Sequence, residues 1–400
     1  MGVSGALAGA TLTGAAPATG LERQAGPPGV RVAPGVTYRE FDIAAAKGPT
    51  HAHLLTVDLR DRRVKVDLLR PPAVGARATI SSLADSAGAV AGVNGDFFNV
   101  SEAQHPGVAA TGAAVGPAIG SGRALKAAVP NGQRFGPALP PGTTTEDVLG
   151  VGVDGRARLD RIALDGSVTT PTTRLPLRGL NQYALPVGSV GAFTKDWGSV
   201  SRVRATCGTD TDRAAPCSTD THEVTVRDGK VVASSDTPGS GAVPAGTTVL
   251  VGREAGAQQL RKLSPGDKVQ VRHQLVAAGS RVAYRFAIGG FPVLRGGVPL
   301  PGLDARTSAV RTAAGIADGG RRLLLLALDG APSSRTGLSV AEVADVMRGL
   351  GSQDAFNLDG GGSSTLAARA QGAATVSVRN HPSDGTERAV ANGIGVFSQS

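Results

Sequence analysis

The segment from Arg321 to Gly362 constrains the fold more than any other part of the chain. It begins with RRLLLLAL, a continuous apolar run without alternation, as expected of a strand buried on both faces. A Ser-x-x-Glu capping box at Ser339 and Glu342 follows, and apolar residues then recur at helical spacing up to a stop at Gly351. DAFNL predicts a second strand. Strand, helix and strand in this order predict a right-handed crossover, which makes the two strands parallel.

Both predicted strands end in an Asp-Gly pair, at Asp329 and at Asp359. Parallel strands of one sheet leave it at the same edge, and ligands bind outside that edge. A third apolar run, AGAVAGVN, stops abruptly at Asn94 and is followed by Gly95 and Asp96. If this run joins the same sheet, three polar corners meet in one place.

The rest of the chain has mainly strand patterns. AHLLTVDLRDRRVKVDLLRP predicts a hairpin with strands at about 52–59 and 64–69, and a short helical pattern follows at 80–87. Short strands separated by turns fill the middle, where the Asp-Gly pairs in VDGR and RDGK are ordinary hairpin corners. The predicted fold class is α+β: a large mixed β-sheet domain with a C-terminal strand–helix–strand crossover and few helices. We expect one domain at 37–400, with a β-rich insertion or subdomain at about 140–285.

The N-terminal residues 1–36 are predicted to be the remnant of an export signal. The first twenty are small, apolar and free of acids, and a Pro/Gly-rich stretch follows them. A basic n-region is missing, so a flexible leader is the alternative. Cys207 and Cys217 are the two cysteines and lie in one turn-rich segment, which predicts a disulfide in an exported protein. The alternative is a pair of free thiols.

No apolar run is long enough to span a membrane, so we expect a secreted or envelope-associated protein and not an integral membrane protein. The net charge is +9, with 41 basic residues interleaved with 32 acidic ones. Such a diffuse positive field could attract anionic substrates or an anionic cell envelope. The alternative is a compositional bias without a partner. Nucleic acid is not an expected partner, because no aromatic residues stand among clustered basic ones.

The stretch NLDGGGSST predicts an anion site. Consecutive glycines can turn their amides toward one point, and such nests bind phosphate, although a plain flexible turn is the alternative. The candidate binding residues in this loop are Gly360, Gly361, Gly362 and Ser363. Arginines suit phosphate oxygens, and the candidates near the glycine-rich motifs are Arg295, Arg311 and Arg388.

Other kinds of site are less well supported by the sequence. The loop lacks the Gly-Lys-Ser/Thr ending of a P-loop, and the chain has no Gly-x-Ser-x-Gly elbow. His105 and His381 both precede prolines and are expected to be structural loop residues. The sequence shows no metal-binding His pair, so no metal and no cofactor are expected. Calcium is the alternative, because it accepts Asp and Asn oxygens as ligands.

Six motifs in order resemble the phosphodiester glycosidase family: GVNGDFFN, IGGFPVLRGG, RTAAGI, LALDG, DAFNLDGGGSSTL and NHPSDGTERAVANGIGVF. The resemblance spans about Ala89 to Phe397 and implies hydrolysis at the anomeric carbon of a sugar 1-phosphodiester. By this resemblance the pocket contains Asn94, Asp96, Phe97, Arg311, Asp329, Asn357, Asp359, Gly360, Gly361, Ser363, Asn380, Glu387 and Arg388. The chain departs from the family at Ala331, where an arginine is usual, and Arg335 could replace it.

The chemistry of such a reaction agrees with these residues. A phosphate ester leaves readily, so its charge must be held, while a carboxylate stabilises the oxocarbenium-like centre. Asp359 or Asp329 is the expected carboxylate, and Asp96 and Glu387 are the further candidates. The resulting hypothesis is an exported hydrolase that cleaves an N-acetylglucosamine-1-phosphodiester or a cell-envelope glycan phosphodiester, releasing sugar and phosphomonoester. The alternative is a non-catalytic glycan-phosphate binding protein, which Ala331 motivates.

Overall fold

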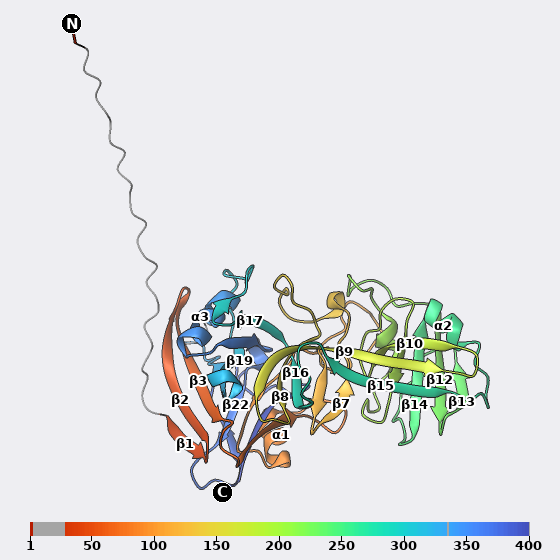
Figure 1. Ribbon diagram of the computed structural model, residues 1–400, viewed down its shortest axis with the longest axis horizontal. Helices are drawn as coiled ribbons and strands as arrows, with labels where there is room; N and C mark the ends of the chain where they lie inside the picture. Colours follow the sequence, from red (N-terminus) through yellow and green to blue (C-terminus); the bar gives the residue numbers. More distant parts are fainter. Residues whose placement is uncertain (3–28, 334–335, 400) are drawn as a thin grey trace.

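Three β-sheets form most of the protein. The computed structural model describes residues 1–2, 29–333 and 336–399. Figure 1 shows the sheets as an elongated body in which the first strands and the green β-rich segment lie at opposite ends. The α-helices of the described residues are α1 (Ile80–Ala87), α2 (Ala255–Leu260) and α3 (Val340–Gly349). This sheet-dominated architecture with few helices confirms the predicted fold class.

The largest part of the candidate site is built on an eight-stranded sheet. Its strands, in spatial order, are β1 (Val30–Ala33), β2 (Val36–Ala45), β3 (Gly48–Asp58), β20 (Arg322–Leu328), β19 (Thr312–Ala317), β21 (Asp354–Asn357), β17 (Phe291–Arg295) and β18 (Val298–Pro299). Helix α3 covers one face through Val343, Ala344 and Met347. Most of the expected leader lies outside the described residues, and β1 begins at Val30.

A five-stranded sheet packs on the other face. Its strands, in spatial order, are β23 (Val376–Val378), β22 (Leu366–Arg369), β5 (Ala91–Asn94), β24 (Gly393–Ser398) and β4 (Val64–Leu69). One buried core contains side chains from both sheets, among them Leu325 of β20, Val93 of β5 and Ile394 of β24. Helix α1 covers the outer face of this smaller sheet through Ile80 and Leu83. The two sheets therefore form a sandwich with a helix on each outer side.

An eleven-stranded sheet extends the molecule away from β1. Its main path is β13 (Lys230–Ser235), β12 (Thr221–Arg227), β14 (Thr247–Arg253), β11 (Val190–Phe193), β10 (Arg174–Leu180), β9 (Ala157–Thr169), β8 (Asp147–Gly152), β16 (Tyr284–Gly289), β6 (Ala118–Gly120) and β7 (Arg123–Lys126), and β15 (Gln270–Ala277) pairs with β9. The sequence range 140–285 supplies eight of these strands, β8 to β15. The domain boundaries themselves stay a prediction.

The C-terminal strand–helix–strand unit follows the sequence pattern closely. Leu323 and Leu325 of β20 face the core between the two sheets, whereas Leu324 and Leu326 face the core under α3, so both faces of β20 are buried. Ser339 and Glu342 form both hydrogen bonds of the capping box. β20 and β21 run parallel, as predicted, because each pairs antiparallel with β19, which lies between them.

The predicted hairpin at 52–59 and 64–69 is wrong. β3 pairs with β2 and β20, while β4 pairs with β24 in the other sheet. Two successive turns, closed by the amides of Asp61 and Val64, redirect the chain between these strands. Both edges of β3 are occupied by β2 and β20, so the chain crosses from one sheet to the other instead of folding back.

The sequence analysis considered that the run ending at Asn94 joins the sheet of β20 and β21, but it does not. It forms β5 of the five-stranded sheet, between β22 and β24. Its glycine and small side chains suit this position, because a Cβ on Gly92 would collide with Leu69 of β4 in the same sheet. The polar corner after β5 nevertheless meets the corner after β21, because the two sheets are stacked.

The double burial of β20 predicts a large effect of side-chain truncation. Leu325→Ala should lower the free energy of unfolding by about 2–5 kcal/mol, because it removes a fully buried side chain and leaves a cavity between the sheets. Val153→Ala is the control, since Val153 is 62% exposed and its truncation should change stability by less than about 0.5 kcal/mol. Urea unfolding of both variants measures the difference, and equal effects would contradict this assignment of the core.

Candidate active site

The site lies where the corner after β5 meets the corner after β21. The Asn94 Nδ2 donates to the Asp359 carbonyl at 2.7 Å, and the Asp359 amide donates to the Gly95 carbonyl at 2.8 Å. The Asn94 Oδ1 accepts from the Thr312 hydroxyl at 2.7 Å and from the Thr365 amide at 3.0 Å. The predicted pocket residue Asn94 therefore ties the two sheets together.

Asp359 is partly exposed at this junction. Its Oδ1 accepts a hydrogen bond from the Gly360 amide at 2.9 Å. Burial raises the pKa of the Asp359 carboxyl to about 6, and the charge of Asp96 adds to this, whereas hydrogen bonds from Ser363 and Gly360 and the charge of Arg388 act in the opposite direction. The carboxyl therefore changes charge close to neutral pH.

Asp96 is the second carboxylate of the site and is only 1% exposed. Its Oδ2 accepts from the Gly116 amide at 2.6 Å, and its amide donates to the Asn392 Oδ1 at 2.9 Å. Within the described residues, its Oδ1 has no hydrogen-bond partner. Burial raises the pKa of Asp96 to about 6, although the charge of Lys126 opposes the shift. Asp96 is therefore a buried carboxyl group whose charge is only partly compensated.

Lys126 lies beneath Asp96 and was not predicted from the sequence. Its Nζ donates to the carbonyls of Gly116 at 2.5 Å and Ala127 at 2.6 Å. Burial lowers the pKa of Lys126 to about 7, while the charge of Asp96 acts to raise it. A lysine within the small apolar stretch RALKAAV is the one sequence signal that could have identified it.

The glycine-rich loop does not present the predicted row of free amides. The amide of Gly361 donates to the Val310 carbonyl at 2.8 Å, and those of Ser363 and Ser364 donate within the loop. The Gly360 amide is bound to the Asp359 carboxylate. These four donors are thus satisfied internally, because the loop forms the tight 3₁₀ turn η4 (Gly361–Ser363).

The loop glycines instead permit close packing against Arg388. A Cβ at Gly362 would collide with the Arg388 guanidinium and the Asp384 carboxylate. The Arg388 Nη2 donates to Asp384 at 2.6 Å, and its Nη1 lies 3.5 Å from the Ser363 hydroxyl. Arg388 therefore stands at the rim of the site beside Asp359, with its charge already paired.

Asp329, after β20, belongs to a neighbouring polar cluster. Its Oδ1 accepts from the His381 amide at 2.5 Å, and the His53 Nε2 lies 3.4 Å from the same oxygen. Burial would raise the pKa of Asp329, but hydrogen bonds from the amide and ring of His381 and the charge of His53 outweigh it and lower the pKa. Asp329 is thus a stably ionised carboxylate that organises two histidines.

The segment 380–384 joins the corners after β20 and β21. Asn380 Nδ2 donates to the carbonyls of Leu328 at 3.3 Å and Ser364 at 2.9 Å, and its Oδ1 accepts from the Leu366 amide at 2.8 Å. The Ser383 hydroxyl donates to the Gly361 carbonyl at 3.3 Å. Asn380 is therefore placed at the site as a bridge between backbone segments.

Four other predicted residues are committed to structural contacts. Both Glu387 carboxylate oxygens accept hydrogen bonds from Ser81 in the first turn of α1. Arg311 donates to the carbonyls of Leu338 and Thr307, and the Asn357 side chain donates to the Leu358 carbonyl. Arg295 is exposed at the far end of β17 and pairs with Asp147. A local sequence motif identifies such positions but does not show where their side chains point.

Arg134 is a further residue that the sequence analysis missed. Its guanidinium lies over the rings of Phe97 and Phe291, 5.3 and 5.7 Å from their centroids, and these two rings are stacked on each other. Burial lowers the pKa of Arg134, whereas the charges of Asp96 and Asp359 raise it. Phe97, a predicted pocket residue, thus supports a cation close to both carboxylates. GQRFG carries no motif that could have identified Arg134.

Metal-ligating side chains also gather beside Asp329. Ligand atoms of Glu40, His51 and His53 all lie within 4.8 Å of one another. In this structure the His51 Nδ1 bonds to Asp42 and the His53 Nδ1 to the Tyr38 hydroxyl, both at 2.7 Å. Two imidazoles suit a transition metal better than calcium. Arg335, the expected substitute for the family arginine, lies outside the described residues.

The disulfide between Cys207 and Cys217 is present, as predicted. It closes the loop 207–217, which precedes β12 in the chain. In the part of the chain that the structure describes, no helix has the length and apolar character needed to cross a membrane.

Asp96 and Asp359 thus lie close to arginines where the two stacked sheets meet. Residues 220–397 match the model of the phosphodiester glycosidase family, as the sequence motifs predicted. Asp329, Asp359 and Arg388 lie in the matched region, whereas Asp96, Lys126 and Arg134 precede it. The comparison with curated proteins finds no match.

Solved structures share the fold. A protein from Synechocystis, described only as hypothetical, superposes with a TM-score of 0.70 at 19% identity and covers 92% of this chain. The chain spans 62% of that protein's length. A protein from Burkholderia pseudomallei with a provisional description as exported has a TM-score of 0.65 at 24% identity, over 87% of this chain and 74% of its own. At these identities the likeness concerns the fold alone.

A third solved structure is the catalytic domain of zebrafish N-acetylglucosamine-1-phosphodiester alpha-N-acetylglucosaminidase, auto-inhibited by its pro-peptide. It has a TM-score of 0.45 at 14% identity, over 95% of this chain and 87% of its own. This likeness is too weak to carry an argument about the site.

The raised pKa of Asp359 predicts a pH-dependent stability difference. The protonated carboxyl favours the folded state, so its contribution is fully present below about pH 4 and is lost as the pH rises through about 6. Asp359→Asn should therefore gain stability relative to the wild type between these values, by up to about 3 kcal/mol for a shift of about two units. Urea unfolding at pH 4 and pH 8 measures it.

Asp345→Asn is the matched control, because Asp345 is exposed on α3 and pairs with Arg348. Its stability difference from the wild type should stay nearly constant over the same range. An Asp359→Asn difference that is also constant would show that the carboxylate is well solvated in the folded protein.

Proposed function

We propose that this protein is an exported hydrolase that cleaves the glycosidic bond of a sugar 1-phosphodiester and releases the sugar and a phosphomonoester. The observation that carries the proposal is the meeting of Asp359 and Asp96, both with a pKa raised to about 6, at one corner beside two arginines. The family match over residues 220–397 supports the same reaction class.

We assign the arginines of the candidate site to the phosphate of the substrate and a carboxylate to its sugar. The phosphate carries negative charge before and after the reaction, and Arg134 and Arg388 are arginines whose charges act on Asp96 and Asp359 respectively. The anomeric carbon becomes cationic, and an ionised carboxylate stabilises it. Asp359 fits this role because it is partly exposed and near its pKa at neutral pH, whereas Asp96 is buried against Lys126 and sets the local charge.

The reaction then balances as a hydrolysis. The bond between the anomeric carbon and the phosphate oxygen breaks, and its electron pair stays with the phosphate. Water supplies the oxygen that bonds to the anomeric carbon, and its proton passes to solvent through a carboxylate. Asp359 acts either as the nucleophile that is later displaced by water or as the base that activates water.

Export and an anionic surface as the place of action are part of the proposal. The disulfide and the fold shared with the Burkholderia protein support export. The net charge of +9 would favour association with an anionic envelope or an anionic glycan. An N-acetylglucosamine-1-phosphodiester or an envelope glycan phosphodiester is the proposed substrate class.

A second candidate function is non-catalytic binding of a glycan phosphate. Ala331 favours it, because this position lacks the arginine that is usual in the family. Both functions require phosphate recognition, and turnover distinguishes them. Tight binding without release of sugar, across a panel of defined glycosyl phosphodiesters, would select the binding function.

The bond assignment is tested by hydrolysis in ¹⁸O-labelled water. Cleavage at the anomeric carbon should place the label in the released sugar and leave the phosphomonoester unlabelled. Mass spectrometry of both products gives the answer. Label in a phosphate product, together with release of sugar 1-phosphate, would identify a phosphodiesterase instead.

The role of Asp359 predicts a loss of turnover with retained binding. Asp359→Asn keeps the size of the side chain but removes its charge, so the turnover number should fall by about three orders of magnitude or more, at ~1.4 kcal/mol for each tenfold step. In the wild type, kcat/KM should decline as the pH falls below about 6, because the ionised form is required. Asp345→Asn should behave as the wild type. Near-normal turnover of Asp359→Asn would transfer the role to Asp329 or Asp96.

We expect no metal requirement for this reaction, since the proposed roles belong to side chains and water. Turnover of the wild type should be unchanged after dialysis against a chelator. Activity that disappears in the chelator and returns with calcium would assign the oxygen-rich corners to a calcium site, whereas restoration by zinc alone would direct attention to Glu40, His51 and His53.

A further inference from the structure

The loop closed by Cys207 and Cys217 holds a short segment of the chain that enters the candidate site. The Gln133 Nε2 donates to the carbonyls of Thr209 at 2.6 Å and Asp212 at 3.1 Å. The Gly132 amide donates to the Asp210 carbonyl at 2.9 Å. Gly208 approaches Gln133 so closely that a Cβ would collide with its side chain, and its φ of +74° also favours glycine. The disulfide loop is thus built against residues 132–133.

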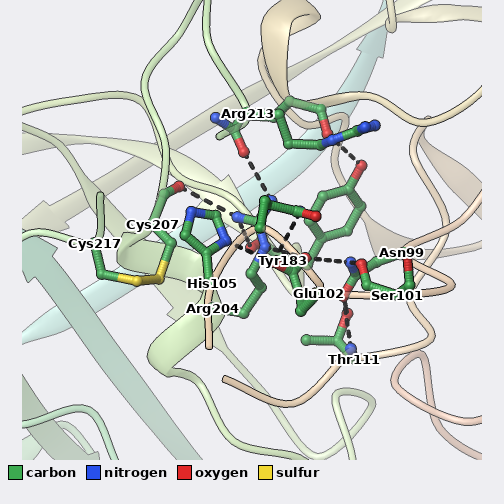
Figure 2. A network of polar contacts seen from close by, with 12 residues as sticks. Asn99, Ser101, Glu102, His105, Thr111, Tyr183, Arg204, Cys207, Arg213 and Cys217 are labelled. Carbon is green, nitrogen blue, oxygen red and sulfur yellow. Dashed lines mark hydrogen bonds and ion pairs between the residues drawn. A yellow bond between two sulfur atoms is a disulfide. The ribbon is translucent and has the colours of Figure 1, made fainter. Parts of the chain in front are cut away.

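A network of buried charged residues also contacts residues 132–133. Arg204 is fully buried and donates to the Glu102 carboxylate, to the Gln133 Oε1 at 2.9 Å and to the Cys207 carbonyl at 3.2 Å. Figure 2 shows Arg204 between Glu102, Tyr183 and the disulfide. Breaking such a buried pair leaves an uncompensated charge and is strongly destabilising. This network therefore restricts where Gln133 can lie.

The network also joins both ends of the disulfide loop. The His105 Nδ1 lies 2.6 Å from the Glu102 carboxylate, and its Nε2 lies 2.9 Å from the Ala215 carbonyl (Figure 2). The Tyr183 hydroxyl donates to the Gln133 carbonyl at 2.8 Å. The side chain and carbonyl of Gln133 are both held, so the backbone that leads into Arg134 has a defined position.

Arg134 itself is held from the loop and aimed at the site. Arg213 Nη1, from the disulfide loop, donates to the Arg134 carbonyl at 2.8 Å, and the Arg213 guanidinium lies 4.1 Å from the centroid of the Phe135 ring. The Arg134 guanidinium lies over Phe97, the residue that follows Asp96, and over Phe291. The loop thus fixes the backbone on either side of Arg134, and two aromatic rings fix its side chain.

The charge of Arg134 is available to a ligand. Over residues 29–333 and 336–399, Arg134 forms no ion pair with a carboxylate, whereas Arg388 is paired with Asp384 and Arg295 with Asp147. The Arg134 Nη1 donates to the Pro137 carbonyl, and this is the one hydrogen bond of its guanidinium among these residues. The Arg311 guanidinium donates hydrogen bonds to the carbonyls of Leu338 and Thr307. A guanidinium presents several N–H donors that match phosphate oxygens in pairs.

The geometry points to Arg134 as the residue that binds the phosphate group of the substrate, and to the disulfide-closed loop 207–217, acting through Gln133 and Arg213, as the element that positions it. This inference rests on the proposed function and names the group that recognises its phosphate. The loop residues are positioning residues, because they act on the substrate only through Arg134.

Titration calorimetry with inorganic phosphate at pH 7 tests the assignment without requiring turnover. Arg134→Gln should weaken phosphate binding by about tenfold to a hundredfold, because it removes a charged hydrogen-bonding group, and Arg134→Lys should retain an intermediate affinity. Arg39→Gln is the matched control, since the Arg39 guanidinium lies 5.0 Å from the Phe41 ring centroid on β2, between β1 and β3. It should bind phosphate as the wild type does.

The positioning role is tested by combining substitutions. Replacing Cys207 and Cys217 by serine should weaken phosphate binding when Arg134 is present and should have no further effect in the Arg134→Gln protein. A general structural role of the disulfide would lower both affinities equally. If the serine protein does not fold, as judged by circular dichroism, Arg213→Ala in the same two backgrounds makes the same test.

The outcomes separate this inference from the proposed function. Wild-type affinity in Arg134→Gln, or no phosphate binding by the wild type, would overturn the assignment of Arg134. Equal weakening in both backgrounds would overturn the positioning role of the loop. If no sugar phosphodiester is hydrolysed but phosphate affinity still depends on Arg134, the proposed function fails and this inference stands.

Discussion

The candidate site depends first on the buried side chain of Asn94. Its amide binds across the boundary between the two stacked sheets, to Thr312 of β19, to Thr365 and to the backbone of Asp359. A buried amide that loses such partners costs about 1–3 kcal/mol for each unsatisfied group. Because every donor and acceptor of Asn94 points to a different segment, it sets the separation and register of the corners that carry the carboxylates.

The candidate site contains charged side chains whose burial costs free energy. Asp96 and Lys126 face each other in the interior, and burial moves the pKa of each toward neutrality. Asp359 nearby is raised as well, partly by the charge of Asp96. Burial with incomplete compensation is common where a side chain must exchange protons or bind charge, and less so where charges only stabilise the fold. These electrostatics distinguish this corner from that of Asp329, whose carboxylate is stabilised as an anion by the neighbouring histidines.

The candidate site combines residues from inside and from outside the part of the chain that matches the family model. Asp359 and Arg388 lie within the family match at 220–397, whereas Asp96, Lys126 and Arg134 precede it and come from the corner after β5, the strand β7 and a loop. The disulfide loop belongs to the region that borders the eleven-stranded sheet, yet its contacts end beside the carboxylates. The disulfide loop thus contacts the residues that lead to the candidate site.

The sequence by itself determined the local elements and the polar corners. Four features depend on residues only a few positions apart: the bounds of α1, the capping box of α3, the double burial of β20 and the Asp-Gly hairpin corners. Their periodicity and hydrogen bonds can therefore be recognised in a short stretch of sequence. Tertiary structure alone decided that β3 and β4 lie in different sheets and that Glu387 binds Ser81. It also decided that four amides of the glycine-rich loop, those of Gly360, Gly361, Ser363 and Ser364, are satisfied internally. It also decided that Lys126 and Arg134 reach the carboxylates, because the partner of a buried charge is selected by packing between segments distant in sequence, and no local pattern records that choice.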